Sequence, residues 1–316
     1  MTKHEAGETV LTVDDLHKSF GGTVAVDGIS FTVKKGEVFT IIGPNGAGKT
    51  TTLEMIEGLQ EPDRGSVAVL GMNWAANKSQ IKMVIGVQPQ TSALFDLLTV
   101  EENLETFASF YDRRRPTDEI LGYINMADHR NKRVKALSGG QKQRLAIGLA
   151  MISDPELIFL DEPTTGLDPQ ARRNIWDIVL KLKAIGKTTI LTTHYMEEAD
   201  KLSDRVCIVD QGRIVALDTP KALIGRLTKE REIHLTFTGG DEHASLAEHI
   251  ALNNAAVTRV KRSGDHLVVW SLQPEETLYQ LFGFTSQQSI GVEQVSIREM
   301  SLEDVFIAFT GKEWRD

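Results

Sequence analysis

The sequence places a glycine-rich octapeptide directly after a run of five uncharged, mostly apolar residues. Val38–Ile42 predicts a buried strand, and Gly43–Thr50 reads Gly-Pro-Asn-Gly-Ala-Gly-Lys-Thr. Glycines let consecutive backbone N–H groups turn towards a phosphate where a Cβ would obstruct the approach. A helix after the loop would point its positive end at the same anion. The segment therefore predicts a phosphate-binding loop between a strand and a helix.

Within this loop the residue types indicate separate contacts. We expect Lys49 to meet the β- and γ-phosphates of a nucleotide and the hydroxyl of Thr50 to bind Mg²⁺. The helix after the loop is expected to bury one face formed by Leu53, Ile56 and Leu59. The expected nucleotide-binding residues are Gly43, Pro44, Asn45, Gly46, Ala47, Gly48, Lys49, Thr50 and Thr51.

A second apolar run ends in two adjacent carboxylates. Leu157–Leu160 predicts a buried strand, and Asp161 and Glu162 follow it. Many strands end in acidic residues that only cap the next helix, so the pattern alone is weak. In a chain with a phosphate loop, it predicts Asp161 near the metal and Glu162 near an attacking water.

A third motif, Leu137–Gln141 (Leu-Ser-Gly-Gly-Gln), comes before the apolar helix expected over Leu145–Ile152. One interpretation is an ordinary serine N-cap. The other interpretation is a second anion-binding site at the start of this helix. A nucleotide bound in the phosphate loop would account for only one such site, so the second would need another explanation.

At these residues the chain resembles the ATP-binding cassette (ABC) family, the ATPase subunits of ABC transporters, over about residues 10–225. Gly43–Thr50 is similar to Walker A, Leu137–Gln141 to the signature sequence, and Leu157–Glu162 to Walker B with its catalytic glutamate. The resemblance implies ATP hydrolysis with Mg²⁺. It also implies that two cassettes pair head to tail, so that the signature of one closes over the ATP held by the other.

The same resemblance implies roles for isolated residues. It places Gln90 at Mg²⁺ as a sensor of the membrane subunit, His194 at the γ-phosphate, and Asp168 in the D-loop Gly166–Asp168. Phe20 takes the place of the family's adenine-stacking aromatic, usually tyrosine, and keeps the π-face. The implied catalytic residues are Glu162, His194 and Gln90, the implied metal ligands are Thr50, Gln90 and Asp161, and further nucleotide contacts are expected from Phe20, Ser138, Gly139, Gly140, Gln141 and Asp168.

The alternation of short strands and helices predicts an α/β fold. The resemblance implies that residues 1–228 form a P-loop ABC cassette, with a mixed sheet and a helical subdomain at about 95–150. Thr99 and Glu102 predict a capping box in that subdomain. Beyond it we expect a third strand at Thr189–Thr192. Residues 229–316 predict the order strand, helix, hairpin, helix, strand and helix, typical of a small ferredoxin-like α+β domain with a regulatory or dimerisation role.

Charge and hydropathy limit the partners. Residues 230–316 carry 14 acidic against 7 basic side chains, which excludes nucleic acid as the partner of this segment. No stretch approaches the ~18–20 apolar residues of a membrane span, and the N-terminus lacks an apolar signal core. We therefore expect a protein at the cytoplasmic face of the membrane, held there by membrane-spanning permease subunits.

The C-terminal part of the sequence indicates a more specific function. Ser301–Phe306 followed by Thr310 and Gly311 resembles the C-terminus of bacterial exporter ATPases of the daunorubicin-resistance type. The alternative is a soluble ABC ATPase acting on ribosomes or DNA. Ser138 follows Lys49 by only 89 positions, which leaves no room for the long coiled coil of the DNA-repair members. A regulatory GTPase is disfavoured because Asn77–Gln80 and Asn131–Val134 both lack the aspartate of the Asn-Lys-x-Asp base-reading run.

Overall fold

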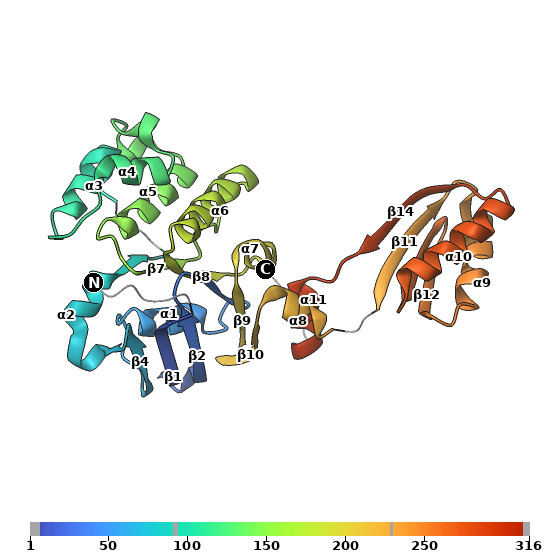
Figure 1. The fold of residues 1–316 in the computed structure, drawn as a ribbon, viewed down its shortest axis with the longest axis horizontal. Coiled ribbons are helices and arrows are strands. Elements are labelled where there is room, and N and C mark those ends of the chain that lie inside the picture. The colour runs from blue at the N-terminus through green and yellow to red at the C-terminus, as the bar shows by residue number, and fades with distance from the viewer. Residues whose placement is uncertain (1–6, 91–93, 228–229, 312–316) are drawn as a thin grey trace. The chain divides into compact units, whose positions relative to one another are not determined.

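The computed structural model describes residues 7–90, 94–227 and 230–311, which form two compact units (Figure 1). One unit runs to Leu223 and takes in the chain again from Phe306, and the other is Ile224–Val305. The sequence predicts a division into residues 1–228 and 229–316. That division differs from the observed one because it places the end of the last helix, from Phe306, in the second unit. In the described part of the chain, no helix combines the length and the apolar character that a membrane span requires.

A six-stranded sheet forms the centre of the first unit, in the order β10-β9-β3-β8-β7-β6. Its strands pair in parallel except for β10, which forms an antiparallel hairpin with β9, so the predicted mixed sheet is confirmed. The hairpin turns at Gln211 and Gly212, both with positive φ, as in a type I′ turn. The strands are β3 (Val38–Ile42), β6 (Ile85–Gln88), β7 (Leu157–Asp161), β8 (Thr188–Thr193), β9 (Arg205–Asp210) and β10 (Arg213–Asp218).

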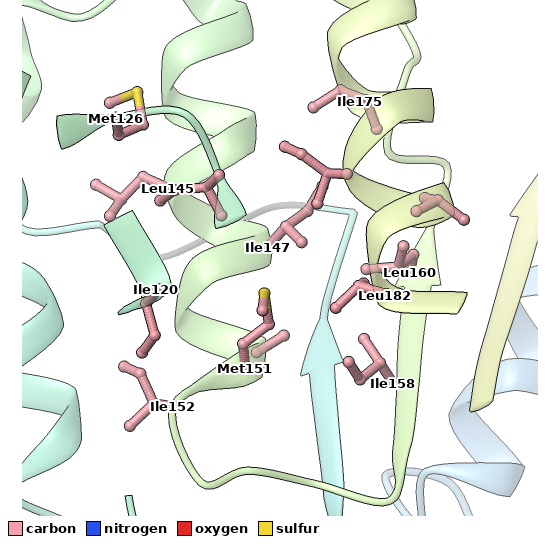
Figure 2. Close-up of a cluster of buried hydrophobic side chains, with 14 of the residues drawn as sticks. Ile120, Met126, Leu145, Ile147, Met151, Ile152, Ile158, Leu160, Ile175 and Leu182 are labelled. Carbon is pink, nitrogen blue, oxygen red and sulfur yellow. The ribbon is translucent and has the colours of Figure 1, made fainter. Parts of the chain in front are cut away.

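Both faces of this sheet are buried, which explains why β3 and β7 are nearly continuous apolar runs. In β7, Ile158 and Leu160 belong to one hydrophobic core, whereas Phe159 belongs to the other. Figure 2 shows Ile158 and Leu160 facing side chains of two helices, among them Met151 and Leu182. These helices are α5 (Gly139–Met151) and α6 (Pro169–Ala184).

A second, antiparallel sheet covers the other core, in the order β2-β1-β4-β5. This sheet was not predicted, because β1 contains the polar run Asp14–Asp15, and its pairing with β2 shifts register several times. Such bulges break the alternation by which a half-buried strand is recognised. The strands are β1 (Thr9–Phe20), β2 (Thr23–Lys34), β4 (Arg64–Val69) and β5 (Met72–Asn73).

The helix after the phosphate loop, α1 (Lys49–Ile56), is shorter than its sequence pattern predicts. Leu53 and Ile56 are buried as expected, but the prediction for Leu59 is wrong, since this side chain is 66% exposed. Gly58, at φ +72°, ends the helical conformation before Leu59 can join its face. The other helices outside the subdomain are α2 (Trp74–Val84), α7 (Met196–Leu202) and α8 (Pro220–Gly225).

A helical region lies on the α6 side of the main sheet (Figure 1). The capping box predicted for Thr99 and Glu102 is confirmed: each side chain accepts a hydrogen bond from the backbone N–H of the other residue. Ser138 and Gln141 form a second capping box at the start of α5. The region comprises α3 (Val100–Ala108), α4 (Thr117–Tyr123), the 3₁₀ turns η1 (Ala127–His129) and η2 (Val134–Ala136), and α5.

The second unit is an antiparallel four-stranded sheet in the order β12-β13-β11-β14. Its chain order, β-α-β-β-α-β, with this strand order is the ferredoxin-like connectivity expected from the sequence. A core of its own lies between the sheet and two helices. The elements are β11 (Arg231–Phe237), α9 (Gly240–Leu252), β12 (Val257–Ser263), β13 (His266–Ser271), α10 (Pro274–Gln287) and β14 (Val292–Arg298), and the chain continues into α11 (Leu302–Thr310).

Candidate nucleotide site

The phosphate loop joins β3 to α1, and two of its glycines are required by close backbone contacts. A Cβ on Gly43 would lie 2.3 Å from the carbonyl oxygen of Val209, and one on Gly48 would lie 2.3 Å from that of Ala25. Gly48 is also the N-cap of α1 and has φ +98°, a conformation that L side chains rarely adopt. The loop therefore keeps its shape only with glycine at both positions.

Lys49, the first residue of α1, is buried, and its ammonium is surrounded by oxygen atoms. Its Nζ donates to the carbonyl oxygens of Gly43 at 2.8 Å and Pro44 at 3.3 Å, and lies 3.4 Å from Oε1 of Glu162. Burial lowers the pKa of Lys49, and the charges of Glu162 and Asp161 oppose that effect. The lysine is thus a cation held between the loop and the acidic end of β7.

Asp161 closes β7 as a buried carboxylate. Thr192, on the adjacent strand β8, donates from Oγ1 to Oδ1 of Asp161 at 2.5 Å. Burial raises the pKa of Asp161, while the hydrogen bond from Thr192 lowers it. A cation placed beside this carboxylate would stabilise its charged form, which burial disfavours.

Glu162 leaves the strand in a left-handed conformation, with φ +45°. Its backbone N–H points back to β8 and donates to the Oγ1 of Thr192 at 3.0 Å. This bend directs its carboxylate away from that of Asp161: Thr165 donates to Oε2 at 3.0 Å, and Nδ1 of His194 lies 3.4 Å from the same oxygen. Non-glycine residues in this conformation carry backbone strain and cluster at functional sites.

Lys49 and Glu162 line one pocket of about 270 Å³, whereas Asp161, Thr192 and His194 are not among its lining residues. Gln90, which follows β6, joins the phosphate loop and Glu162 there, although it lies 40 positions after Thr50 and 72 positions before Glu162. Phe20, at the end of β1, is 46% exposed and is not among the lining residues. The pocket is lined by Ala25, Asn45, Gly46, Gly48, Lys49, Thr50, Thr51, Gln90 and Glu162.

Ser138–Gln141 and Asp168 do not line this pocket. Ser138 caps α5, and Gln141 also contacts Nε2 of His129 at 2.9 Å. Asp168 caps α6 by accepting from the N–H groups of Gln170 and Ala171. The two helix starts are packed together, since a Cβ on Gly140 would lie 2.8 Å from that of Ala171. Within the described residues, these predicted contacts thus form a second cluster.

Sequence reasoning missed Ala25, which lines the pocket, and three residues outside its lining that act on Asp161 or Glu162. Thr192 and Thr165 hold the two carboxylates, and Glu57, at the C-cap of α1, is a buried acid whose pKa is raised to about 8 by burial and by the charges of Asp161 and Glu54. An acid followed by glycine at the end of an apolar helix was the only signal for Glu57. The threonines gave none, because their role depends on which strands are neighbours.

Residues 26–165 match the family described as ABC transporter. The chain is 38% identical over 312 residues to the Nod factor export ATP-binding protein I of Ralstonia nicotianae, covering 97% of this chain and 95% of that protein. It is 35% identical over 314 residues to the linearmycin resistance ATP-binding protein of Bacillus subtilis, covering 97% of this chain and all of that protein.

Among solved structures, a dimeric ATP-binding cassette in a post-hydrolysis state, bound to ADP and Pi, matches 66% of this chain and 98% of its own, with a TM-score of 0.60 and 27% identity. The site described above contains a glycine-rich loop, a buried lysine and two adjacent carboxylates at the end of a strand. The fold of this cassette and the near-complete coverage of the relatives are consistent with such a site. The chain belongs to the ABC transporter family, among the ATP-binding subunits that hydrolyse ATP to power transport.

Proposed function

We propose that this chain hydrolyses ATP with Mg²⁺ between two copies of the cassette and thereby powers an exporter whose membrane-spanning subunits are separate chains. The observation that carries the proposal is the pocket in which Lys49, Gln90 and Glu162 meet the phosphate loop. The export function is supported by two relatives that are named for Nod factor export and for linearmycin resistance. The alternative on ribosomes or DNA has no comparable support.

The residues of the pocket fit a nucleotide phosphate and Mg²⁺. Gly43 and Gly48 have no side chains that could cover the loop backbone, and the close contacts there leave no room for them. Lys49 supplies a cation beside the loop carbonyl groups. The hydroxyl of Thr50, the amide of Gln90 and the carboxylate of Asp161 are the oxygen donors that Mg²⁺ prefers. When bound, Mg²⁺ neutralises the developing charge on the phosphate oxygens.

Glu162 is the proposed base for the attacking water. Its carboxylate lines the pocket and lies between Lys49 and His194. Lys49 would exchange its contact with Glu162 for the γ-phosphate, which leaves the carboxylate to accept a proton from water. His194 would hold the γ-phosphate from the other side of Glu162.

Ser138–Gln141 and Asp168 would serve the partner cassette. The α5 helix presents its N-terminus at exposed residues, away from the chain's own pocket, and anions bind well at such a helix end. Two chains related by a twofold axis would each place this helix end over the other's loop. The dimeric state of the structural neighbour supports the same arrangement.

The test uses the full chain in two assays. We expect Mg²⁺-dependent phosphate release from ATP, and a shift from the monomer to the dimer mass when ATP is bound but not hydrolysed. Cross-linking in native membranes, followed by mass spectrometry, should capture a membrane-spanning subunit at the cytoplasmic face. A chain that releases no phosphate, or that remains monomeric with ATP at every concentration, contradicts the proposal.

A further inference from the structure

A buried carboxylate of the first unit lies outside the lining of the nucleotide pocket, on the short helix that follows His194. This residue, Glu198 on α7, is fully buried. Its Oε2 accepts from Oγ1 of Thr164 at 3.1 Å, and its Oε1 accepts from Nε1 of Trp176 at 2.9 Å. The side chain of Thr193 donates a third hydrogen bond. The three donors belong to the loop after β7, to α6 and to the end of β8.

The charge of Glu198 makes its burial costly. Burial raises the pKa of this carboxyl group, and the three hydrogen bonds and the charge of Arg172 oppose that effect. An apolar side chain of similar volume would avoid the cost of burying a charge. The carboxylate therefore needs a reason other than stability, and the segments that it connects supply one.

Two of the three donors lie beside the groups proposed for hydrolysis. Thr164 comes two positions after Glu162, and Thr193 directly precedes His194. Nδ1 of His194 lies 3.4 Å from Oε2 of Glu162. This contact spans the same two segments that the carboxylate of Glu198 joins.

The backbone pairing of the two strands ends before these residues. The pairing of β7 with β8 extends to Asp161 and Thr192. One step further, the N–H of Glu162 donates to the carbonyl oxygen of Thr192 at 3.2 Å. Glu198 then links Thr164 to Thr193 through side chains. It thus extends the connection between the two segments past the end of the strand pairing.

The hydroxyl of Thr193 carries this connection to both sides of His194. Besides donating to Glu198, its Oγ1 accepts from the backbone N–H of Tyr195 at 3.0 Å. The ring of Tyr195 lies against that of His194, with centroids 4.1 Å apart. A hydroxyl held by Glu198 therefore constrains the residue before His194 and the residue after it.

We propose that Glu198 is a positioning residue for ATP hydrolysis, which holds the segments of Glu162 and His194 together through Thr164 and Thr193. The inference rests on the proposed function, because it takes Glu162 as the base for the attacking water. Glu198 does not line the pocket, so it acts through its neighbours. Loss of its acceptor oxygens should slow hydrolysis and leave nucleotide affinity nearly unchanged.

The experiment measures steady-state phosphate release and ATP binding on the full chain. Glu198→Leu keeps the approximate volume of the side chain and removes both acceptor oxygens. We expect kcat to fall about 10–100-fold, as for a displaced reacting group, with ATP affinity within a few-fold of the unmodified chain. Glu198→Gln keeps an acceptor for Trp176 and an amide that can donate to a threonine hydroxyl, so it should recover most of kcat.

Further variants separate positioning from a loss of stability. Leu202→Ala, on the same helix and 2% exposed, should destabilise the chain but leave kcat per ATP-binding chain unchanged. Thr164→Val removes only one donor, so it tests the same link with less risk to folding and should slow hydrolysis several-fold. In the Glu162→Gln background, Glu198→Leu should lower the remaining rate by less than about twofold, because Glu198 acts through Glu162.

Four outcomes overturn the proposal: kcat of Glu198→Leu or Thr164→Val equal to that of the unmodified chain, Glu198→Gln as slow as Glu198→Leu, an equal loss of kcat in Leu202→Ala, or a full effect of Glu198→Leu in the Glu162→Gln background. Each of them counts against Glu198 alone. Absence of phosphate release from the unmodified chain would instead count against the proposed function.

Discussion

Nζ of Lys49 lies 3.4 Å from Oε1 of Glu162, so the phosphate-loop cation and the proposed catalytic base are in contact across the pocket. The pairing keeps both buried charges partly compensated. A nucleotide phosphate would replace Glu162 as the partner of Lys49, and it would approach the carboxylate closely. In the proposed mechanism, the charge of Glu162 would oppose binding of the γ-phosphate and would assist the attack of water.

Glu162→Gln should separate these two effects. We expect ATP·Mg²⁺ binding at least as tight as in the unmodified chain, a hydrolysis rate lower by about 10²–10⁴-fold, and accumulation of an ATP-bound dimer. Steady-state phosphate release and size-exclusion with ATP·Mg²⁺ measure these quantities. Glu156→Gln, just before the same strand, is the matched control and should leave the rate unchanged. Turnover of Glu162→Gln within a few-fold of the unmodified chain would remove Glu162 from the mechanism.

Ser138→Arg should abolish hydrolysis without abolishing nucleotide binding. The arginine would block closure over the partner's γ-phosphate, whereas Ser138 lies outside the chain's own pocket. Loss of the serine cap costs only about 1 kcal/mol, so the fold should persist. Calorimetry measures ATP binding to the monomer, and Ser79→Arg on the exposed surface of α2 is the control. If the Ser138 variant fails to bind ATP, the proposed division between two chains is wrong.

Thr192→Val should weaken the metal site, while Thr189→Val should not. Both threonines are buried in β8, but Thr192 holds Asp161 and the N–H of Glu162, whereas the Oγ1 of Thr189 has no partner among the described residues. We expect Thr192→Val to lower the free energy of unfolding by about 1–3 kcal/mol and to weaken Mg²⁺-dependent ATP affinity. Thr189→Val should be neutral or stabilising. Equal effects of the two variants on ATP affinity would contradict a positioning role for Thr192.

Phe306→Ala should destabilise the first unit, with which the end of α11 is grouped. Phe306 is 1% exposed, so its truncation should cost about 3–5 kcal/mol. Phe309, on the same helix, is 45% exposed and is the matched control, with a much smaller expected cost. Thermal unfolding followed with and without ATP measures the effect on the nucleotide-binding unit. Equal costs for both variants would argue against burial of Phe306.

Glu57 predicts a fall in stability as pH rises. Its pKa is about 8 in the folded chain against an ordinary value of 4.5, so between these values the unfolded chain releases a proton that the folded chain retains. Each unit of difference is worth about 1.4 kcal/mol. The contribution is complete below about pH 4.5 and is lost as pH rises towards 8.

The difference in unfolding free energy between Glu57→Gln and the unmodified chain isolates this contribution. Urea unfolding at about pH 6 and about pH 9, without Mg²⁺, should show a relative gain for the variant that grows with pH to several kcal/mol. If the difference in unfolding free energy between the two proteins is the same at both pH values, Glu57 ionises as readily in the folded chain as in the unfolded one, which contradicts the prediction.

Local sequence patterns were enough to predict the phosphate loop, three strands of the main sheet and the order of elements in the second unit. These follow from local rules: apolar runs form buried strands, glycines permit the loop, and Thr99 with Glu102 caps a helix from three residues away. The nucleotide-binding assignment of Lys49 came from the same local spacing, within one strand–loop–helix segment.

The surroundings of the buried ionisable side chains, in contrast, depend on the tertiary fold. Thr192 reaches Asp161 because β7 and β8 are neighbours in the sheet, although 31 positions separate the two residues. Glu57 is an acid at a helix end in the sequence, and its burial beside residues of α3 and α5 follows only from the tertiary fold. Hydrogen bonding and burial depend on contacts between distant segments, and a local pattern of residues does not contain that information.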